Sequence, residues 1–149
     1  MNPFMRIAYD EALAGIAAKD GGPFGAVVVK DGAIIAQGHN EVLLRCDPSA
    51  HAEVVAIRKA CEKLGRVELS DCELYASAKP CPMCKGAIQW ARIPTVYYSG
   101  DYEDTNRLNF DDDAFAKDVD AEENWHQIDQ EHFGILVDAF EAYKDEIRY

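Results

Sequence analysis

The feature that most constrains the fold is the order of apolar patterns along residues 25–99. Residues 26–29 and 33–37 each have the pattern of a strand, and the Lys-Asp-Gly turn at 30–32 predicts that they pair as a β-hairpin. Helical and extended patterns then alternate at residues 50–64, 73–77, 87–92 and 95–99. Strands and helices in this order predict a three-layer α/β domain.

Both ends of the chain add a helical pattern. Residues 4–16 place apolar side chains at helical spacing, and Gly-Gly-Pro at 21–23 ends that pattern. Residues 135–143 predict a final amphipathic helix. Between the core pattern and this helix, residues 101–124 turn acidic, and a solvated loop and ordered structure are equally open for them.

Size, charge and cysteine count narrow the class of protein. A chain of 149 residues, 48% of them hydrophobic, suits one domain spanning residues 1–149. The net charge of -12 repels a phosphate backbone and disfavours nucleic acid as a partner. No apolar run approaches the roughly 20 residues that a membrane helix needs, and residues 1–10 do not resemble an export signal. With five cysteines, an odd number, we expect a cytoplasmic protein with reduced thiols or a metal site.

Two short motifs carry the chemistry, His-Ala-Glu at 51–53 and Pro-Cys-Pro-Met-Cys at 80–84. Each is weak alone, because Cys-x-x-Cys also occurs in structural zinc and redox sites and His-x-Glu arises by chance in helices. Together, and in this order, they match the signature of zinc deaminases. His51, Cys81 and Cys84 would give zinc three protein ligands and leave the fourth tetrahedral position open, which is typical of a catalytic site.

Both motifs are predicted at the N-termini of helices. Asp-Pro-Ser at 47–49 offers capping oxygens and a proline suited to a first turn, so His51 and Glu53 fall at the start of a helix. Cys81 and Cys84 open the next helix, where the helix dipole and a zinc ion both favour thiolates. A carboxylate beside a zinc-activated water can move its proton, so Glu53 is the predicted catalytic residue.

These residues resemble a known family, the cytidine-deaminase-like zinc deaminases, and most closely its bacterial guanine deaminase branch. The resemblance runs from residues 21–32 through 47–53 and 80–84 to Phe-Asp-Asp at 110–112 and to Tyr149. It implies an α/β/α sandwich around a central mixed sheet and a zinc cofactor. It also implies hydrolytic deamination of an aminated purine, guanine being converted to xanthine and ammonia.

The resemblance further implies how a nucleobase is held. The implied substrate-binding residues are Phe24, Asn40, Ala52, Trp90, Asp112 and Tyr149. The two ring systems at positions 24 and 90 would lie against the base, and the amide at position 40 would bind its polar edge. A donor-rich purine suits an aromatic stack and an acidic acceptor. The resemblance also implies a homodimer in which a C-terminal segment of about residues 124–149 is exchanged and completes the partner's pocket.

One departure bears on the substrate. Similar guanine deaminases usually carry Cys-Glu before the Pro-Cys-Pro-Met-Cys run, whereas this chain has Ala78 and Lys79. A reversed charge there could change which edge of the substrate the site recognises. The alternative, equally open, is that Lys79 points outward and balances an acidic surface. Other substrates remain open as well, namely cytosine, guanosine or a triazine.

Two further alternatives belong to different classes of function. A tRNA adenosine deaminase shares the motifs but is disfavoured by the acidic charge, because folded RNA favours a basic surface. A non-catalytic zinc-binding assembly domain would need neither Glu53 nor an open metal position.

Overall fold

The computed structural model describes residues 1–110, 112–119, 126–128, 130–132 and 134–141. The chain divides into two compact units, Met1–Val119 and Asp120–Tyr149. The second unit contains a short 3-10 helix, η1 (Gln130–His132), and α7 (Gly134–Glu141). The whole segment predicted to exchange, about residues 124–149, falls in this unit. Tyr149 lies outside the described residues. No helix among the described residues is long and apolar enough to cross a membrane.

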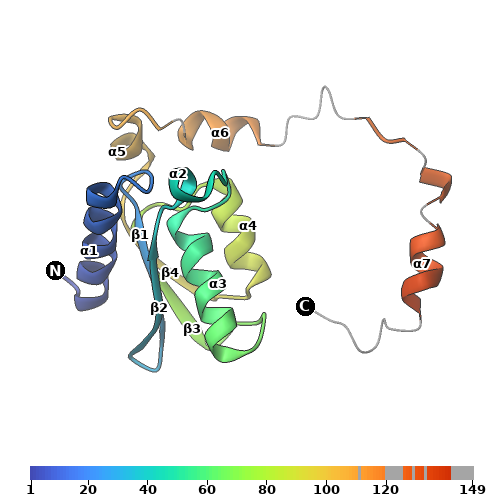
Figure 1. The fold of residues 1–149 in the computed structure, drawn as a ribbon, viewed down its shortest axis with the longest axis horizontal. Coiled ribbons are helices and arrows are strands. Elements are labelled where there is room, and N and C mark those ends of the chain that lie inside the picture. The colour runs from blue at the N-terminus through green and yellow to red at the C-terminus, as the bar shows by residue number, and fades with distance from the viewer. Residues whose placement is uncertain (111, 120–125, 129, 133, 142–149) are drawn as a thin grey trace. The chain divides into compact units, whose positions relative to one another are not determined.

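A four-stranded sheet with strand order β2-β1-β3-β4 forms the centre of the first unit (Figure 1). Its strands are β1 (Gly25–Lys30), β2 (Ala33–His39), β3 (Cys72–Ala78) and β4 (Thr95–Gly100). Strand β1 runs antiparallel to both β2 and β3, whereas β3 and β4 are parallel. The sheet is therefore mixed, as the family resemblance implies.

The predicted β-hairpin is present. Its turn consists of Asp31 and Gly32, whose φ angles of 50° and 74° are both positive. Two consecutive residues with positive φ make the turn whose twist matches that of the flanking strands. Glycine adopts this conformation without strain, and aspartate is one of the residues that tolerates it.

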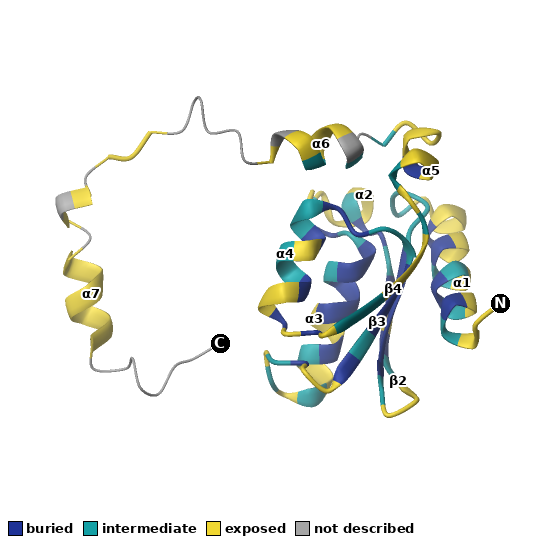
Figure 2. Ribbon diagram, turned by 180° about the vertical axis from the view of Figure 1, so that it is seen from behind, coloured by how far each residue is buried: buried dark blue, intermediate teal, exposed yellow. Residues whose placement is uncertain are grey.

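Helices cover both faces of the sheet, so the first unit has three layers (Figures 1 and 2). Its helices are α1 (Pro3–Ala18), α2 (Val42–Arg45), α3 (Ala52–Leu64), α4 (Pro82–Trp90), α5 (Tyr102–Asn106) and α6 (Asp112–Asp118). On β1, Val27 and Val29 pack with residues of α1. The alternate side chains, Ala26 and Val28, pack with residues of α3 and α4. Because β1 is buried on both faces, its sequence is almost continuously apolar.

Helix α3 begins at Ala52 rather than at the predicted residue 50. The side chain of Asp47 accepts the N–H of Ser49 at 2.8 Å, which closes a turn before the helix instead of capping it. His51 is the N-cap residue, with an extended backbone. The predicted end of the helix is confirmed, since Gly65 caps it with a φ of 66°.

The acidic stretch at residues 101–124 is not a continuous loop. Asp101 is the N-cap of α5, and its carboxylate accepts the N–H groups of Glu103 and Asp104. The side chain of Asp104 accepts the N–H of Asp101 in return, which completes a capping box. Aspartates at the start of a helix also interact favourably with its dipole.

Gly25 lies where α1 crosses β1, and this contact generates a stability prediction. A Cβ at position 25 would overlap the carbonyl oxygen of Ala8. We expect Gly25→Ala to lower the free energy of unfolding by about 1–3 kcal/mol, because overpacking forces backbone to move. The control is Gly86→Ala within α4, where an added Cβ meets no atom within 4 Å. That change should raise stability by about 0.5–1 kcal/mol. Urea unfolding at saturating zinc measures both, and equal stabilities would contradict the packing.

Candidate active site

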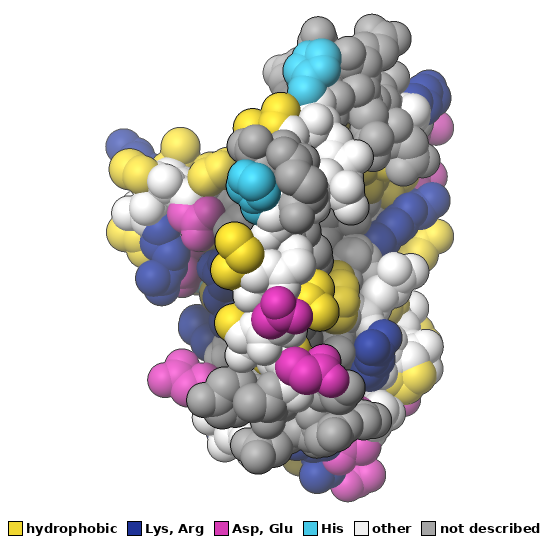
Figure 3. All heavy atoms as spheres, turned by 90° about the vertical axis from the view of Figure 1, so that its right-hand side faces the viewer, with side chains coloured by type: hydrophobic (Ala, Val, Ile, Leu, Met, Phe, Trp, Pro, Cys, Tyr) yellow, Lys and Arg dark blue, Asp and Glu magenta, His cyan; other side chains and the backbone are white. Residues whose placement is uncertain are grey.

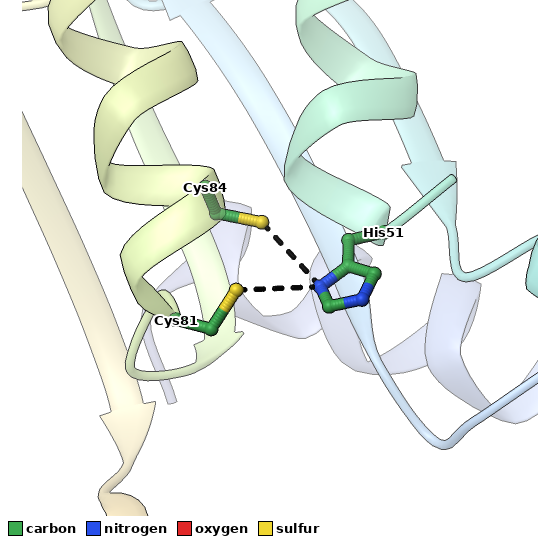
Figure 4. Close-up of side chains that lie close together, drawn as sticks. All are labelled: His51, Cys81 and Cys84. Atoms are coloured by element: carbon green, nitrogen blue, oxygen red, sulfur yellow. Dashed lines mark hydrogen bonds between the residues drawn. The ribbon is translucent and has the colours of Figure 1, made fainter. Parts of the chain in front are cut away.

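The N-termini of α3 and α4 bring the two sequence motifs together (Figure 4). His51 is the N-cap of α3 and Cys81 is the N-cap of α4, and both have an extended backbone. Cys84 lies in the first turn of α4, on the side that faces His51 (Figure 4). Pro82 occupies the first position of α4, where its missing N–H costs no hydrogen bond.

The three side chains have the spacing of a tetrahedral metal site. His51 Nδ1 lies 3.5 Å from Cys81 Sγ and 3.6 Å from Cys84 Sγ. Zinc bonded tetrahedrally to sulfur and nitrogen at usual lengths separates those ligand atoms by about 3.6 Å. Within the described part of the chain, these residues are the only group of three or more metal-binding side chains found so close together. They would hold zinc through three protein ligands.

The two cysteine thiols of the cluster differ in pKa. A hydrogen bond from the Cys84 thiol, helped by one from His51, lowers the pKa of Cys81 to about 4. The same hydrogen bond and burial raise the pKa of Cys84, and the interaction with Cys81 raises the pKa of His51. Converting both buried thiols to thiolates therefore requires positive charge beyond that of His51, and a divalent cation supplies it.

Glu53 lies beside this cluster, in the first turn of α3. Its side chain is 7% exposed, and its Oε2 accepts a hydrogen bond from Cys84 Sγ at 3.4 Å. Burial raises the pKa of Glu53. A buried carboxyl group near the metal ligands, but outside their triad, is suited to take up and release a proton.

A cavity of about 390 Å³ opens beside the cluster. Its lining includes the predicted residues Phe24, Asn40, His51, Glu53 and Asp112. The structure thus brings one proposed base-stacking residue, one amide and two carboxylates to the same space as a metal ligand. Such a combination of apolar wall and few polar groups is typical of a small-molecule site.

Hydrogen bonds orient the amide of Asn40 within the cavity wall. Asn40 is 4% exposed, and its Oδ1 accepts the N–H of Val42 at 3.1 Å. Its own N–H donates to the carbonyl oxygen of Phe24 at 3.0 Å. With Oδ1 engaged, the Nδ2 group is the part of this amide that is left to donate to a ligand.

Trp90 is not among the described residues that line this cavity, and its role in binding the base stays a prediction. Its side chain is 63% exposed at the C-terminal end of α4, next to Arg92. The cysteines open that helix, and the span from Pro82 to Trp90 is about 12 Å. Trp90 is the last residue of α4, whereas the cysteines lie at its start. Ala52 is fully buried and does not line the cavity.

The aromatic partner of Phe24 is Phe110. Their ring centroids lie 5.0 Å apart at an angle of 76°. Phe110 falls within the Phe-Asp-Asp motif at 110–112, but the sequence alone indicates no role for it. A Cβ on Gly22 would come within 2.9 Å of the Phe110 ring, so the Gly-Gly pair that opens the first motif was the available signal.

Lys79 contacts both the cavity and the aromatic side chains at the end of the sheet. It lines the cavity, and its backbone N–H donates to Gly100 at 2.7 Å. Its Nζ lies 4.7 Å from the ring centroid of Tyr102 and 6.0 Å from that of Tyr98. The hydroxyl of Tyr102 in turn donates to the carbonyl oxygen of Pro80 at 2.8 Å. Lys79 therefore lines the cavity while its ammonium group lies over two tyrosine rings, and its contact with the substrate stays a prediction.

Comparison with known families decides what this cluster is. Residues 1–100 match the family described as the cytidine and deoxycytidylate deaminase zinc-binding region. The chain belongs to this family. Zinc is therefore the metal of this family's site, and the cluster of His51, Cys81 and Cys84 is suited to bind it.

Individual members of the deaminase family match to different extents. Guanine deaminase of Bacillus subtilis is 48% identical over 144 residues, which cover 95% of this chain and 92% of that protein. A crystal structure of guanine deaminase from Bacillus subtilis superposes with a TM-score of 0.90 and 46% identity, covering 100% of this chain and 99% of that one. The tRNA-specific adenosine deaminase of Aquifex aeolicus is 43% identical over 96 residues, 64% of this chain and 63% of that protein.

The ligand assignment predicts the metal content of this deaminase. We expect about one zinc per chain, and Cys81→Ala or Cys84→Ala should lose it, because two protein ligands bind zinc far more weakly than three. The exposed Cys46 supplies the control, since Cys46→Ala should keep full zinc content. Elemental analysis after dialysis measures all three variants. Full zinc in a Cys81→Ala, Cys84→Ala double variant would refute the assignment.

Proposed function

We propose that this deaminase converts guanine and water to xanthine and ammonia in the cytoplasm. One observation carries the proposal: the zinc-binding cluster and Glu53 open onto a cavity whose wall includes Phe110 and Asp112. Both of these residues lie beyond residues 1–100, the part that the chain shares with the whole family. The match to the Bacillus guanine deaminase extends over that additional part, whereas the match to the Aquifex tRNA deaminase is confined to about two thirds of the chain.

Bound zinc would act as a Lewis acid that lowers the pKa of water toward about 7. Glu53 would take a proton from the attacking water and deliver it to the ring nitrogen beside the carbon that bears the amino group. It would then carry the second proton of the water to the departing amino group, which leaves as ammonia. The raised pKa of Glu53 suits a group that must accept and release a proton in each turnover.

The cavity wall would orient the base for this attack. Phe24 and Phe110 offer an aromatic surface for a planar ring. The Nδ2 group of Asn40 would donate to an acceptor on the purine, and the carboxylate of Asp112 would accept from its N–H groups. Aligning the amino-bearing carbon with Glu53 is worth a large share of the rate, because orientation replaces a chance encounter.

The proton-transfer role of Glu53 gives a direct test of this function. Glu53→Gln should keep zinc and the fold but lose about 10²–10⁴-fold in turnover of guanine, because an amide cannot carry the protons. The matched control is Glu62→Gln, which removes an exposed carboxylate from the same helix. Ammonia release and zinc content are measured for both variants. Near-normal ammonia release from Glu53→Gln would show that another group moves the protons.

We also propose that the enzyme is a homodimer in which about residues 124–149 of one subunit complete the site of the other. The support comes from α7, whose described residues are all exposed. Ile135, Leu136, Val137 and Phe140 are between 44% and 68% exposed. Hydrophobic side chains are among those at the surface in Figure 3. A helix as short as α7 is not stable alone in water, so it requires a partner surface.

Exchange of this segment predicts complementation between two inactive chains. A Glu53→Ala chain keeps its tail, and a chain that lacks residues 142–149 keeps its zinc site. Equal amounts of the two, refolded together with zinc, should form mixed dimers with one complete site and regain about a quarter of the normal activity. Native mass spectrometry confirms that mixed dimers form. If they form and remain inactive, the tail does not act on the partner's site.

A further inference from the structure

We propose that His39 is a positioning residue: its ring, held between the carboxylates of Glu11 and Asp20, fixes the wall of the cavity that receives the base. The inference rests on the proposed function only for the identity of the ligand. His39 ends β2, Glu11 lies on α1, and Asp20 lies in the segment that leads from α1 to the cavity.

The geometry defines the state of the ring. His39 Nδ1 lies 2.9 Å from Glu11 Oε2, and His39 Nε2 lies 2.8 Å from Asp20 Oδ2. Ionised carboxylates only accept hydrogen bonds, so a ring with a carboxylate on each nitrogen must donate from both and carry a positive charge. All three side chains are between 16% and 18% exposed, so water screens these contacts only in part.

The ring also fits against the backbone of α1. A Cβ on Gly15 would lie 2.7 Å from Cδ2 of His39, closer than real Cβ contacts come. The ring therefore occupies a space that exists because position 15 is glycine. Steric contact on one side and an ion pair at each nitrogen leave His39 with one orientation.

This cluster joins the two segments that form the cavity wall. Asp20 is followed by Gly21 and Gly22, which line the cavity, and its carbonyl oxygen accepts the N–H of Leu43 at 2.9 Å. His39 is followed by Asn40, the amide proposed to bind the base. The ion pair between His39 and Asp20 thus helps to hold residues 20–24 against residues 40–44.

Because His39 carries a positive charge, its ion pairs with Glu11 and Asp20 depend on pH. Partial burial lowers the pKa of His39, but hydrogen bonds and charges from Glu11 and Asp20 outweigh burial and raise the pKa above its usual value. Those carboxylates are the titratable groups that face the ring, from α1 and from the segment after it. On the strand itself, Gln37 donates to Glu11 at 2.6 Å and carries no charge. A raised histidine pKa means that His39 is fully protonated below about pH 6.5. Its ion pairs with Glu11 and Asp20 are lost as pH rises through the pKa of the folded state.

Kinetics between pH 6 and pH 9 test the inference on the zinc-loaded enzyme with guanine. His39→Gln should raise KM about 3- to 10-fold and leave kcat within about twofold, because the wall binds the base but moves no proton. KM of the unaltered enzyme should rise over the alkaline part of this range, whereas KM of the variant should stay flat. Gly15→Ala, which displaces the ring without removing it, should also raise KM. The control is Gln37→Ala, which leaves both carboxylates on the ring and should match the unaltered enzyme.

Hydrogen–deuterium exchange tests the positioning role of His39 independently of whether guanine is the substrate. In the zinc-loaded enzyme without substrate, residues 20–24 and 40–44 should exchange faster in His39→Gln than in the unaltered chain at pH 6, while β3 stays equally protected. If guanine is not turned over at all, this comparison still decides the role of His39. Equal exchange in both proteins, or faster exchange with an unchanged KM for guanine, would overturn the proposal.

Discussion

The candidate active site depends on two helix N-termini that face each other beside one sheet. His51 and Cys81 are N-cap residues with extended backbones, so their side chains lie ahead of α3 and α4 and not along their flanks. The partial positive charge of both helix ends favours thiolates at Cys81 and Cys84. Glu53, in the first turn of α3, lies beside the same cluster without belonging to the proposed ligands. Metal binding and proton transfer therefore share one structural origin.

The sheet holds these helix ends in register through close packing. A Cβ on Gly38 of β2 would lie 2.7 Å from Cγ1 of Val55, so α3 packs directly on the strand backbone. Strand β1 is buried on both faces and separates α1 from α3 and α4. The same sheet positions two residues of the cavity wall, because Asn40 directly follows β2 and Phe24 directly precedes β1. Small shifts of α1 or α3 would therefore reach the residues proposed to bind the base.

Local sequence patterns predicted much of this arrangement, and tertiary context decided the remainder. The hairpin, the end of α3 and the His-Cys-Cys triad follow from turn residues and motif spacing, which need no knowledge of distant contacts. The proposed role of Trp90 stays a prediction: its side chain is 63% exposed at the C-terminal end of α4, and how that end packs depends on contacts that no local pattern specifies. The partnership of Phe24 with Phe110 joins segments far apart in the chain, so no local pattern could specify it. The role of Tyr149 remains a prediction, since that residue lies outside the described residues.

Ammonia release from a panel of substrates tests most directly whether this site deaminates guanine. The zinc-loaded protein would be offered guanine, isoguanine, adenine, cytosine, guanosine, a triazine and a tRNA with an unpaired adenosine. The geometry of the cavity and the acidic surface predict the highest kcat/KM for guanine, with xanthine as the product, and no release from the tRNA. Release of ammonia from any other member of the panel, with guanine left intact, would contradict the assignment.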